Sequence, residues 1–78
     1  RVRTMHFPLN NEDVWDEYDI IITTNENLVK TKPEGKVVVL IEKEDNTDSI
    51  ENSDYSFKTL SEALDDNTFI EITKLVKR

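Results

Sequence analysis

Two uninterrupted aliphatic runs constrain the fold more than any other feature of the chain. Residues 18–24 contain three consecutive Ile, and residues 36–41 contain five consecutive aliphatic side chains. A strand with one face in water shows a polar residue at every second position, and neither run does. Both faces of each strand should therefore be covered, as in interior parallel strands. The sequence predicts an α/β fold with a small, largely parallel sheet of three to four strands and flanking helices.

The segments before the first run predict a further strand and a helix. Residues 2–7 alternate in character and fit a less buried first strand, which Pro8 ends because proline has no backbone N–H to donate. Residues 10–18 favour a short helix, with Asn10 or Asn11 as its cap. Trp15 offers this helix its largest buried side chain.

The connection between the two runs leaves the direction of their pairing open. Residues 25–35 are short and polar and hold one turn of helix at most, with a bend at Pro33 and Gly35. A parallel crossover commonly takes a dozen or more residues. Parallel pairing is the expectation, and antiparallel pairing is the alternative.

The second half of the chain predicts a loop and two helices. Residues 42–56 are expected to form a solvated acidic loop, which lacks the glycine and ligand spacing of a calcium loop. A short helix should follow over residues 57–65, with an edge strand over residues 55–59 as the alternative. The last helix should begin with a capping box formed by Thr68 and Glu71 and lie across the sheet.

Length and composition exclude several classes of protein. A chain of 78 residues predicts one domain, residues 1–78, and its net charge of −7 disfavours direct contact with nucleic acid. The absence of cysteine excludes disulfides, thiolate zinc sites and thiol nucleophiles, and fits a reducing compartment. The longest apolar run is far short of the roughly 20 residues of a membrane span. We therefore expect a cytoplasmic domain without cofactor, metal or membrane contact.

The candidate functional residues are few. Thr23, Thr24 and Asn25 follow the first aliphatic run, where α/β sheets bind ligands, although a turn and a helix cap would use the same residues. His6 is the sole imidazole and a candidate for phosphorylation, but an exposed strand residue is the favoured interpretation. The sequence contains no recognisable set of nucleophile, base or metal ligands. We therefore predict no catalytic residue and no enzyme.

The order of these segments resembles a known family. Residues 18–25, Tyr-Asp-Ile-Ile-Ile-Thr-Thr-Asn, with the second aliphatic run and the final helix, are similar to the later part of a IIB domain of the sugar phosphotransferase system. The likeness is greatest to the IIB-like domains at the C-terminus of bacterial transcriptional regulators with phosphotransferase regulation domains, such as the Mga and AtxA types. It covers residues 1–42 and 66–78 and rests on the strand pattern.

The resemblance implies a flavodoxin-like, three-layer fragment and a regulatory role. In IIB proteins a cysteine after the first strand accepts the phosphate; this chain has none, so residues 1–7 would correspond to the second strand. The missing first strand would leave a gap that a partner chain or a rearranged pairing must fill. The implied function is non-enzymatic, through protein–protein contacts and self-association as a homo-oligomer.

Two alternatives of other classes remain. One is a fragment of a phosphotransferase IIB component whose phosphoacceptor cysteine lies upstream of this chain. The other is an acidic partner or inhibitor that mimics nucleic acid.

Overall fold

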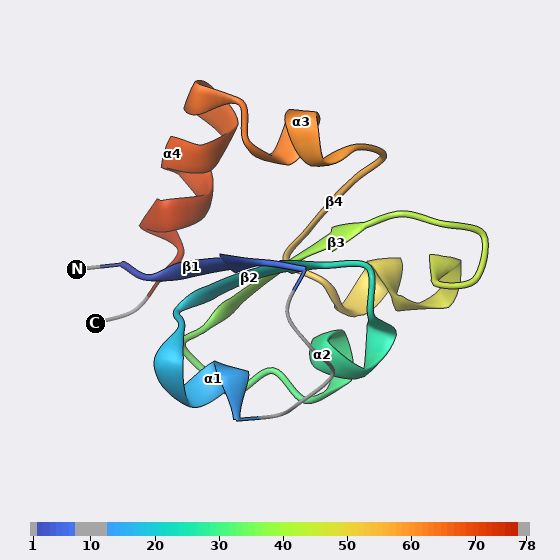
Figure 1. Cartoon of the computed structure of the whole chain (residues 1–78), viewed down its shortest axis with the longest axis horizontal. Helices are drawn as coiled ribbons and strands as arrows, with labels where there is room; N and C mark the ends of the chain where they lie inside the picture. The colour runs from blue at the N-terminus through green and yellow to red at the C-terminus, as the bar shows by residue number, and fades with distance from the viewer. Residues whose placement is uncertain (1, 8–12, 77–78) are drawn as a thin grey trace.

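Four parallel strands make up the sheet of the computed structural model, which describes residues 2–7 and 13–76 (Figure 1). The strand order is β1-β2-β3-β4, and each neighbouring pair is parallel. The strands are β1 (Thr4–His6), β2 (Ile20–Thr23), β3 (Val37–Ile41) and β4 (Tyr55–Phe57). The predicted small parallel α/β sheet is confirmed, and the antiparallel alternative is wrong. All residues of β2 and β3 are buried, as the two aliphatic runs predicted.

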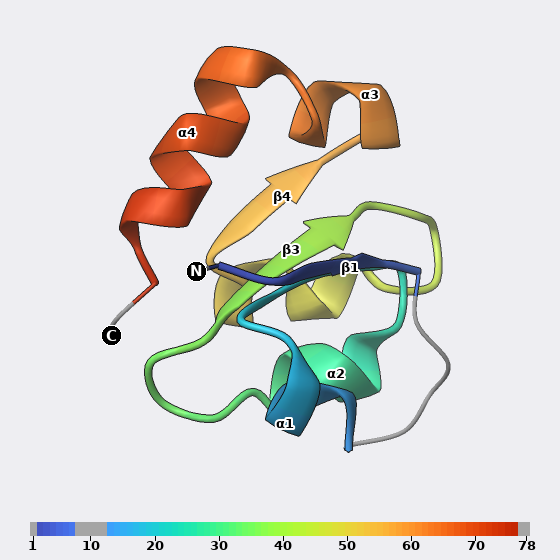
Figure 2. The same cartoon turned by 60° about the vertical axis from the view of Figure 1, so that its left-hand side comes forward.

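Helices cover both faces of the sheet (Figures 1 and 2). Three short helical segments lie on one face, and two helices lie on the other. The first set is α1 (Val14–Glu17), α2 (Glu26–Lys30) and the 3-10 helix η1 (Thr47–Asn52), and the second is α3 (Leu60–Ala63) and α4 (Asp66–Lys74). Every connection between successive strands therefore passes over the same face, and the chain changes face after β4.

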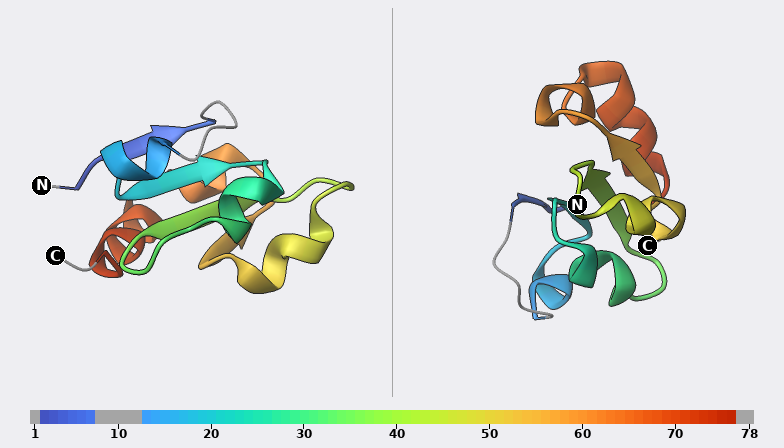
Figure 3. Two further views of the ribbon diagram at one scale, coloured as in Figure 1. Left: turned by 90° about the horizontal axis from the view of Figure 1, so that it is seen from below. Right: turned by 90° about the vertical axis from the view of Figure 1, so that its right-hand side faces the viewer.

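Alternation along the strands sends side chains into two separate cores. Ile20 and Ile22 point to the face of α3 and α4, where they pack with Ile72 of α4. Ile21 points to the opposite face and packs with Trp15, which is 3% exposed as the sequence predicted. The helices and the sheet form three layers (Figure 3), and each half of this arrangement has its own apolar cluster.

A helix of five residues is enough for the crossover between β2 and β3. Asn25 caps α2 two residues after the end of β2, so the chain turns back at once. Leu28 and Val29 then bury 99% and 96% of their surfaces on the sheet. The predicted single turn of helix is confirmed, and its compactness explains how a short link joins parallel strands.

Residues 42–59 differ in two respects from the expected loop and helix. The loop contains η1, which buries Ser49 and half-buries Ile50. The alternative edge strand forms as β4, and the following helix begins only at Leu60, so a helix starting at residue 57 is wrong. Thr59 sets this boundary because its hydroxyl accepts a hydrogen bond from the Glu62 N–H at 3.3 Å.

The capping box predicted at Thr68 and Glu71 is wrong. Helix α4 begins at Asp66, and Thr68 lies inside it. The cap is Asp65, whose carboxylate accepts from the Thr68 N–H at 3.4 Å. The Glu71 carboxylate instead pairs with Lys74 at 3.4 Å. Asp65 provides the same type of cap three residues earlier, and the helix gains a turn.

Two expectations lie wholly or partly outside the described residues. The strand end at Pro8 and the caps at Asn10 and Asn11 fall in residues 8–12. The described part of the predicted N-terminal helix is α1, which begins at Val14.

The strand order bears on the gap that the family resemblance implies. A flavodoxin-like sheet has the order 2-1-3-4-5, and removal of its first strand leaves the order seen here. Strand β1 nevertheless pairs directly with β2, from Thr4 opposite Ile20 to His6 opposite Ile22. In the described sheet these two strands are therefore direct neighbours, with no strand between them.

Helix α4 supplies a matched pair of substitutions that tests the core. Ile72 is fully buried and Ile70 is 52% exposed on the same helix. We expect Ile72→Ala to lower the free energy of unfolding by about 2–5 kcal/mol because it leaves a cavity. Ile70→Ala should change it by less than about 0.5 kcal/mol. Urea denaturation followed by circular dichroism measures both, and equal effects would contradict the packing of α4. If Ile72→Ala does not fold, Ile72→Val gives a milder test.

Candidate functional site

The predicted ligand residues lie at the carboxyl end of β2 and make local hydrogen bonds. The Thr23 hydroxyl accepts from the Asn25 N–H at 2.9 Å, and Thr23 is 2% exposed. The Asn25 side chain accepts from the Asn27 N–H at 2.9 Å and caps α2. Thr24 follows the strand and is half-buried. Turn formation and helix capping thus occupy the Thr23 and Asn25 side chains, and a ligand role for the three residues stays a prediction.

Asn46 closes the same end of the sheet, although its sequence context does not mark it as a site residue. Its side-chain NH2 donates to the carbonyls of Thr24 and Ile41, each at 2.9 Å. Its side-chain oxygen accepts from the Lys43 N–H at 2.7 Å, and the residue is 2% exposed. One amide therefore joins the ends of β2 and β3 to the loop that follows β3.

A second contact holds η1 next to this position. The Ser49 hydroxyl donates to the Glu26 carboxylate at 3.2 Å, and Ser49 is 1% exposed. This contact joins η1 to the first turn of α2. The helical segments next to the carboxyl ends of β2 and β3 are therefore tied to each other.

The topology at the ends of β2 and β3 differs from that of a usual ligand-binding crevice. In doubly wound sheets, ligands bind where two neighbouring connections leave toward opposite faces. Here the connections after β2 and β3 pass over the same face, which is the face of α2 and η1. The carboxyl ends of β2 and β3 thus lack such a switch point, and Asn46 bridges them instead.

The amino ends of the strands carry a repeated aspartate clamp. Asp19 precedes β2, and its carboxylate accepts from the Arg3 N–H at 3.2 Å and from the Lys36 ammonium at 3.1 Å. Asp54 precedes β4, and its carboxylate accepts from the Val38 N–H at 2.9 Å. Each aspartate thus satisfies a backbone donor of the neighbouring strand and holds two strands in register.

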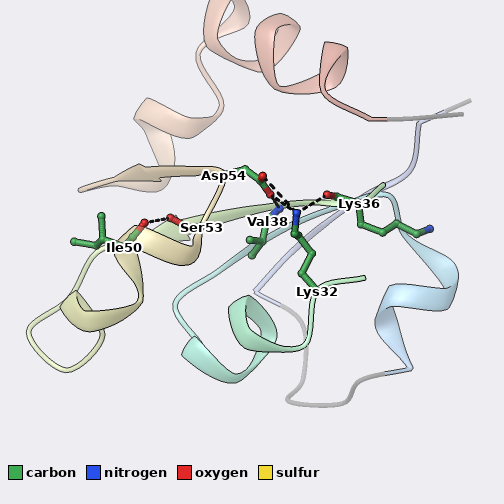
Figure 4. Close-up of polar contacts among 6 residues, drawn as sticks. All are labelled: Lys32, Lys36, Val38, Ile50, Ser53 and Asp54. Atoms are coloured by element: carbon green, nitrogen blue, oxygen red, sulfur yellow. Dashed lines mark hydrogen bonds and ion pairs between the residues drawn. The ribbon is translucent and has the colours of Figure 1, made fainter. Parts of the chain in front are cut away.

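A lysine accompanies the second clamp as well (Figure 4). The Lys32 ammonium lies 3.2 Å from the Asp54 carboxylate and donates to the Lys36 carbonyl at 3.1 Å. These lysines come from the connection between β2 and β3. A cationic group and a carboxylate neutralise each other at each clamp.

The Asp19 clamp changes the acidity of its carboxyl group. The backbone N–H of Arg3 is the largest cause, and the hydrogen bond from Lys36 is the second; together they lower the pKa of Asp19 below its ordinary value of 3.8. Both contacts favour the charged carboxylate. The folded state therefore holds Asp19 in its ionised form.

His6 lies on the exposed side of β1, away from both sets of clamps. It lines a shallow groove of about 480 Å³ with Leu64, Asp66, Phe69 and Ile70. This groove is mainly apolar, and the structure brings none of Thr23, Thr24 or Asn25 to it. The expected exposed position of His6 is confirmed, and its phosphorylation stays a prediction.

These features define a class of protein: a small α/β domain with an all-parallel, four-stranded sheet between two helical layers. Comparison with protein-family models, with curated proteins and with solved structures finds no match to this chain. Within residues 2–7 and 13–76, no group of three or more His, Cys, Asp or Glu side chains is placed to hold a metal ion. None of the described helices is long and apolar enough to cross a membrane.

Asn46 provides a test of the closed strand ends. We expect Asn46→Ala to lower the free energy of unfolding by about 1–3 kcal/mol, because two carbonyls and one N–H lose their partner. Asn52→Ala, at an exposed position of η1, is the matched control and should change stability by less than about 0.5 kcal/mol. Thermal and urea unfolding measure both, and a neutral Asn46→Ala would contradict the structural role.

Asp19 makes the stability of the fold depend on pH. Because its folded-state pKa lies below its unfolded value, its contribution is fully present above pH 3.8 and is lost as the pH falls through the folded-state value. Asp19→Asn should therefore destabilise the domain at pH 7 and reduce the further loss of stability on acidification. The exposed substitution Asp45→Asn is the control. Urea titrations between pH 2 and pH 7 measure the difference, and parallel curves for wild type and Asp19→Asn would contradict it.

Proposed function

We propose that this chain is a non-enzymatic regulatory domain of a bacterial transcriptional regulator, which acts in the cytoplasm through protein–protein contacts and self-association. The proposal rests on a difference between the polar and the apolar side chains of this fold. The polar side chains at both ends of β2 and β3 are engaged in holding the fold together. Large apolar side chains, in contrast, are left at the surface.

These exposed apolar side chains surround the layer of α3 and α4. Leu64, Ile70 and Leu75 are 37%, 52% and 46% exposed, and Phe7 at the end of β1 is 48% exposed. Leu64 and Ile70 line one groove together with Phe69, and exposed apolar surface of this kind is typical of sites that contact other proteins. An acidic domain with such surface has the properties of an interaction module, and its charge disfavours contact with nucleic acid.

The strand order supports the family resemblance that suggests a regulator. The order β1-β2-β3-β4, with the last helix on the face opposite α1 and α2, is that expected for a flavodoxin-like sheet without its first strand. The same observation favours the second candidate function, a fragment of a phosphotransferase IIB component. In that case the phosphoacceptor cysteine belongs to the segment ahead of residue 1.

The gene that encodes the chain separates these two functions. For a regulator, we expect a DNA-binding region ahead of this domain. Removal of residues 1–78 should then alter transcription of a reporter from the target promoter without weakening the affinity of the DNA-binding region for its site. Reporter assays and gel-shift titrations measure the two effects.

The opposite results would identify the second candidate. A strand that ends in a cysteine loop directly ahead of residue 1, and incorporation of labelled phosphate at that cysteine, would overturn the regulatory proposal. Size-exclusion chromatography with light scattering tests self-association separately. A strictly monomeric mass at millimolar concentration would remove that part and leave the regulatory role in place.

A further inference from the structure

We propose that the open edge of β1 and the groove beside it bind an extended, basic segment of a partner protein with apolar side chains at alternate positions. The inference rests on the proposed function in that it requires a protein partner. It adds the site of contact and the chemistry of the partner.

The backbone of β1 leaves hydrogen-bonding groups at its outer edge. The Arg3 carbonyl accepts from the Ile20 N–H at 3.1 Å, and the Phe7 N–H donates to the Ile22 carbonyl at 2.6 Å. Backbone groups of a strand alternate in direction, so the N–H and C=O groups of Thr4 and His6 point away from β2. Strand β1 borders the described sheet (Figure 3), and these groups can pair with an added strand.

The groove lies where side chains of such a strand would point. Met5 packs in the core of α1 and α2, so its neighbours Thr4 and His6 face the layer of α3 and α4. Alternate side chains of an added strand would face the same way, toward the groove lined by Phe69 and Ile70. The groove gives these side chains an apolar surface, and main-chain pairing gives the segment its direction.

The carboxyl end of β1 is strained as well as exposed. Phe7 has φ 51° and is 48% exposed. A left-handed conformation is unfavourable for a bulky residue and is found often at binding sites. An exposed aromatic residue thus directly follows the open edge.

Charge distinguishes a basic partner from a second copy of this chain. Asp66 lines the groove and directly follows Asp65 in the sequence. Within residues 2–7 and 13–76, the Asp66 carboxylate has no ion-pair partner. Arg3 lies near the opposite end of β1 and, like Met5, points to the other face. A second copy, with its own net charge of −7, would bring further negative charge to Asp66, whereas lysine or arginine in the partner would neutralise it.

A displayed library of random 12-residue peptides, selected on the full chain, tests this inference. We expect enrichment of peptides with net positive charge and apolar residues at every second position. A selected peptide should bind more weakly as salt is raised and should perturb the amide signals of Thr4 and His6 in nuclear magnetic resonance spectra. Selection of uncharged or acidic peptides, or perturbation confined to other strands, would overturn the inference.

Three substitutions test where the selected peptide binds. His6→Pro removes an N–H that does not pair with β2, so the fold should remain while affinity falls by about tenfold. Asp66→Lys should weaken binding and reduce its salt dependence. Ile70→Asp should weaken binding, whereas Leu75→Asp, at a 46% exposed apolar position that follows the helix and does not line the groove, should not. Unchanged affinity in all three, with circular dichroism showing intact folds, would overturn the inference.

A measurement of mass in solution and the sequence of the gene test this inference and the proposed function independently. If the chain associates with itself and His6→Pro makes it monomeric, a second copy occupies the edge; the inference fails and the regulatory role stands. If selected peptides bind at β1 but the gene encodes an upstream phosphoacceptor cysteine, the regulatory role fails and the edge assignment stands.

Discussion

The structure depends on the burial of β2 and β3 on both faces. Their residues are almost wholly removed from water, and the two cores they form are separated by a single sheet. A chain of 78 residues has few residues left to cover such a sheet, so its helices are short, and α1, α2 and α3 have only four or five residues each. Short helices have little stability of their own and persist here because their apolar side chains pack on the strands. The helical layers and the strand pair are therefore mutually dependent.

Complete burial of the central strands also determines what the polar residues do. The backbone groups where buried strands end still need partners, and water has little access to them. Asp19 and Asp54 satisfy backbone N–H groups at the amino ends, and Asn46 satisfies carbonyls at the carboxyl ends. Residues of the types that bind ligands in larger α/β proteins are thus engaged in the fold. This is the physical reason to look for function at the surface of the layers and at the sheet edges.

The sequence predicts the central part of this fold well, because a strand that is buried on both faces requires an apolar run without polar alternation. Residues 20–23 and 37–41 contain almost no polar residue. The shortness of these runs and their β-branched side chains distinguish buried strands from buried helices. Short elements are harder to predict from the sequence. Strand β4 has three residues, and the pattern around Tyr55 fits either a strand or a helix. Pairing with β3 decides in favour of the strand. The cap at Asp65 and the proposed box at Thr68 differ only in which of two capping residues the tertiary structure uses.

In the candidate site, local contacts can be predicted from the sequence, but contacts between distant residues cannot. Thr23 and Asn25 could be singled out because they follow a strong strand, and their capping role was open to prediction. Asn46 could not, because its partner Thr24 lies 22 residues away and nothing near Asn46 marks it as buried.

Strand β1 offers little backbone for pairing with another chain. It has three residues, and it is followed by a positive φ at Phe7, so a long, flat pairing with another chain is not available. An edge this short contributes few hydrogen bonds, and a partner must gain the rest of its binding energy from the groove and from Asp66. The main chain of β1 alone would accept almost any extended segment, whereas the apolar and acidic lining selects among them. Selectivity at this edge should therefore reside in side chains of α4 rather than in the strand itself.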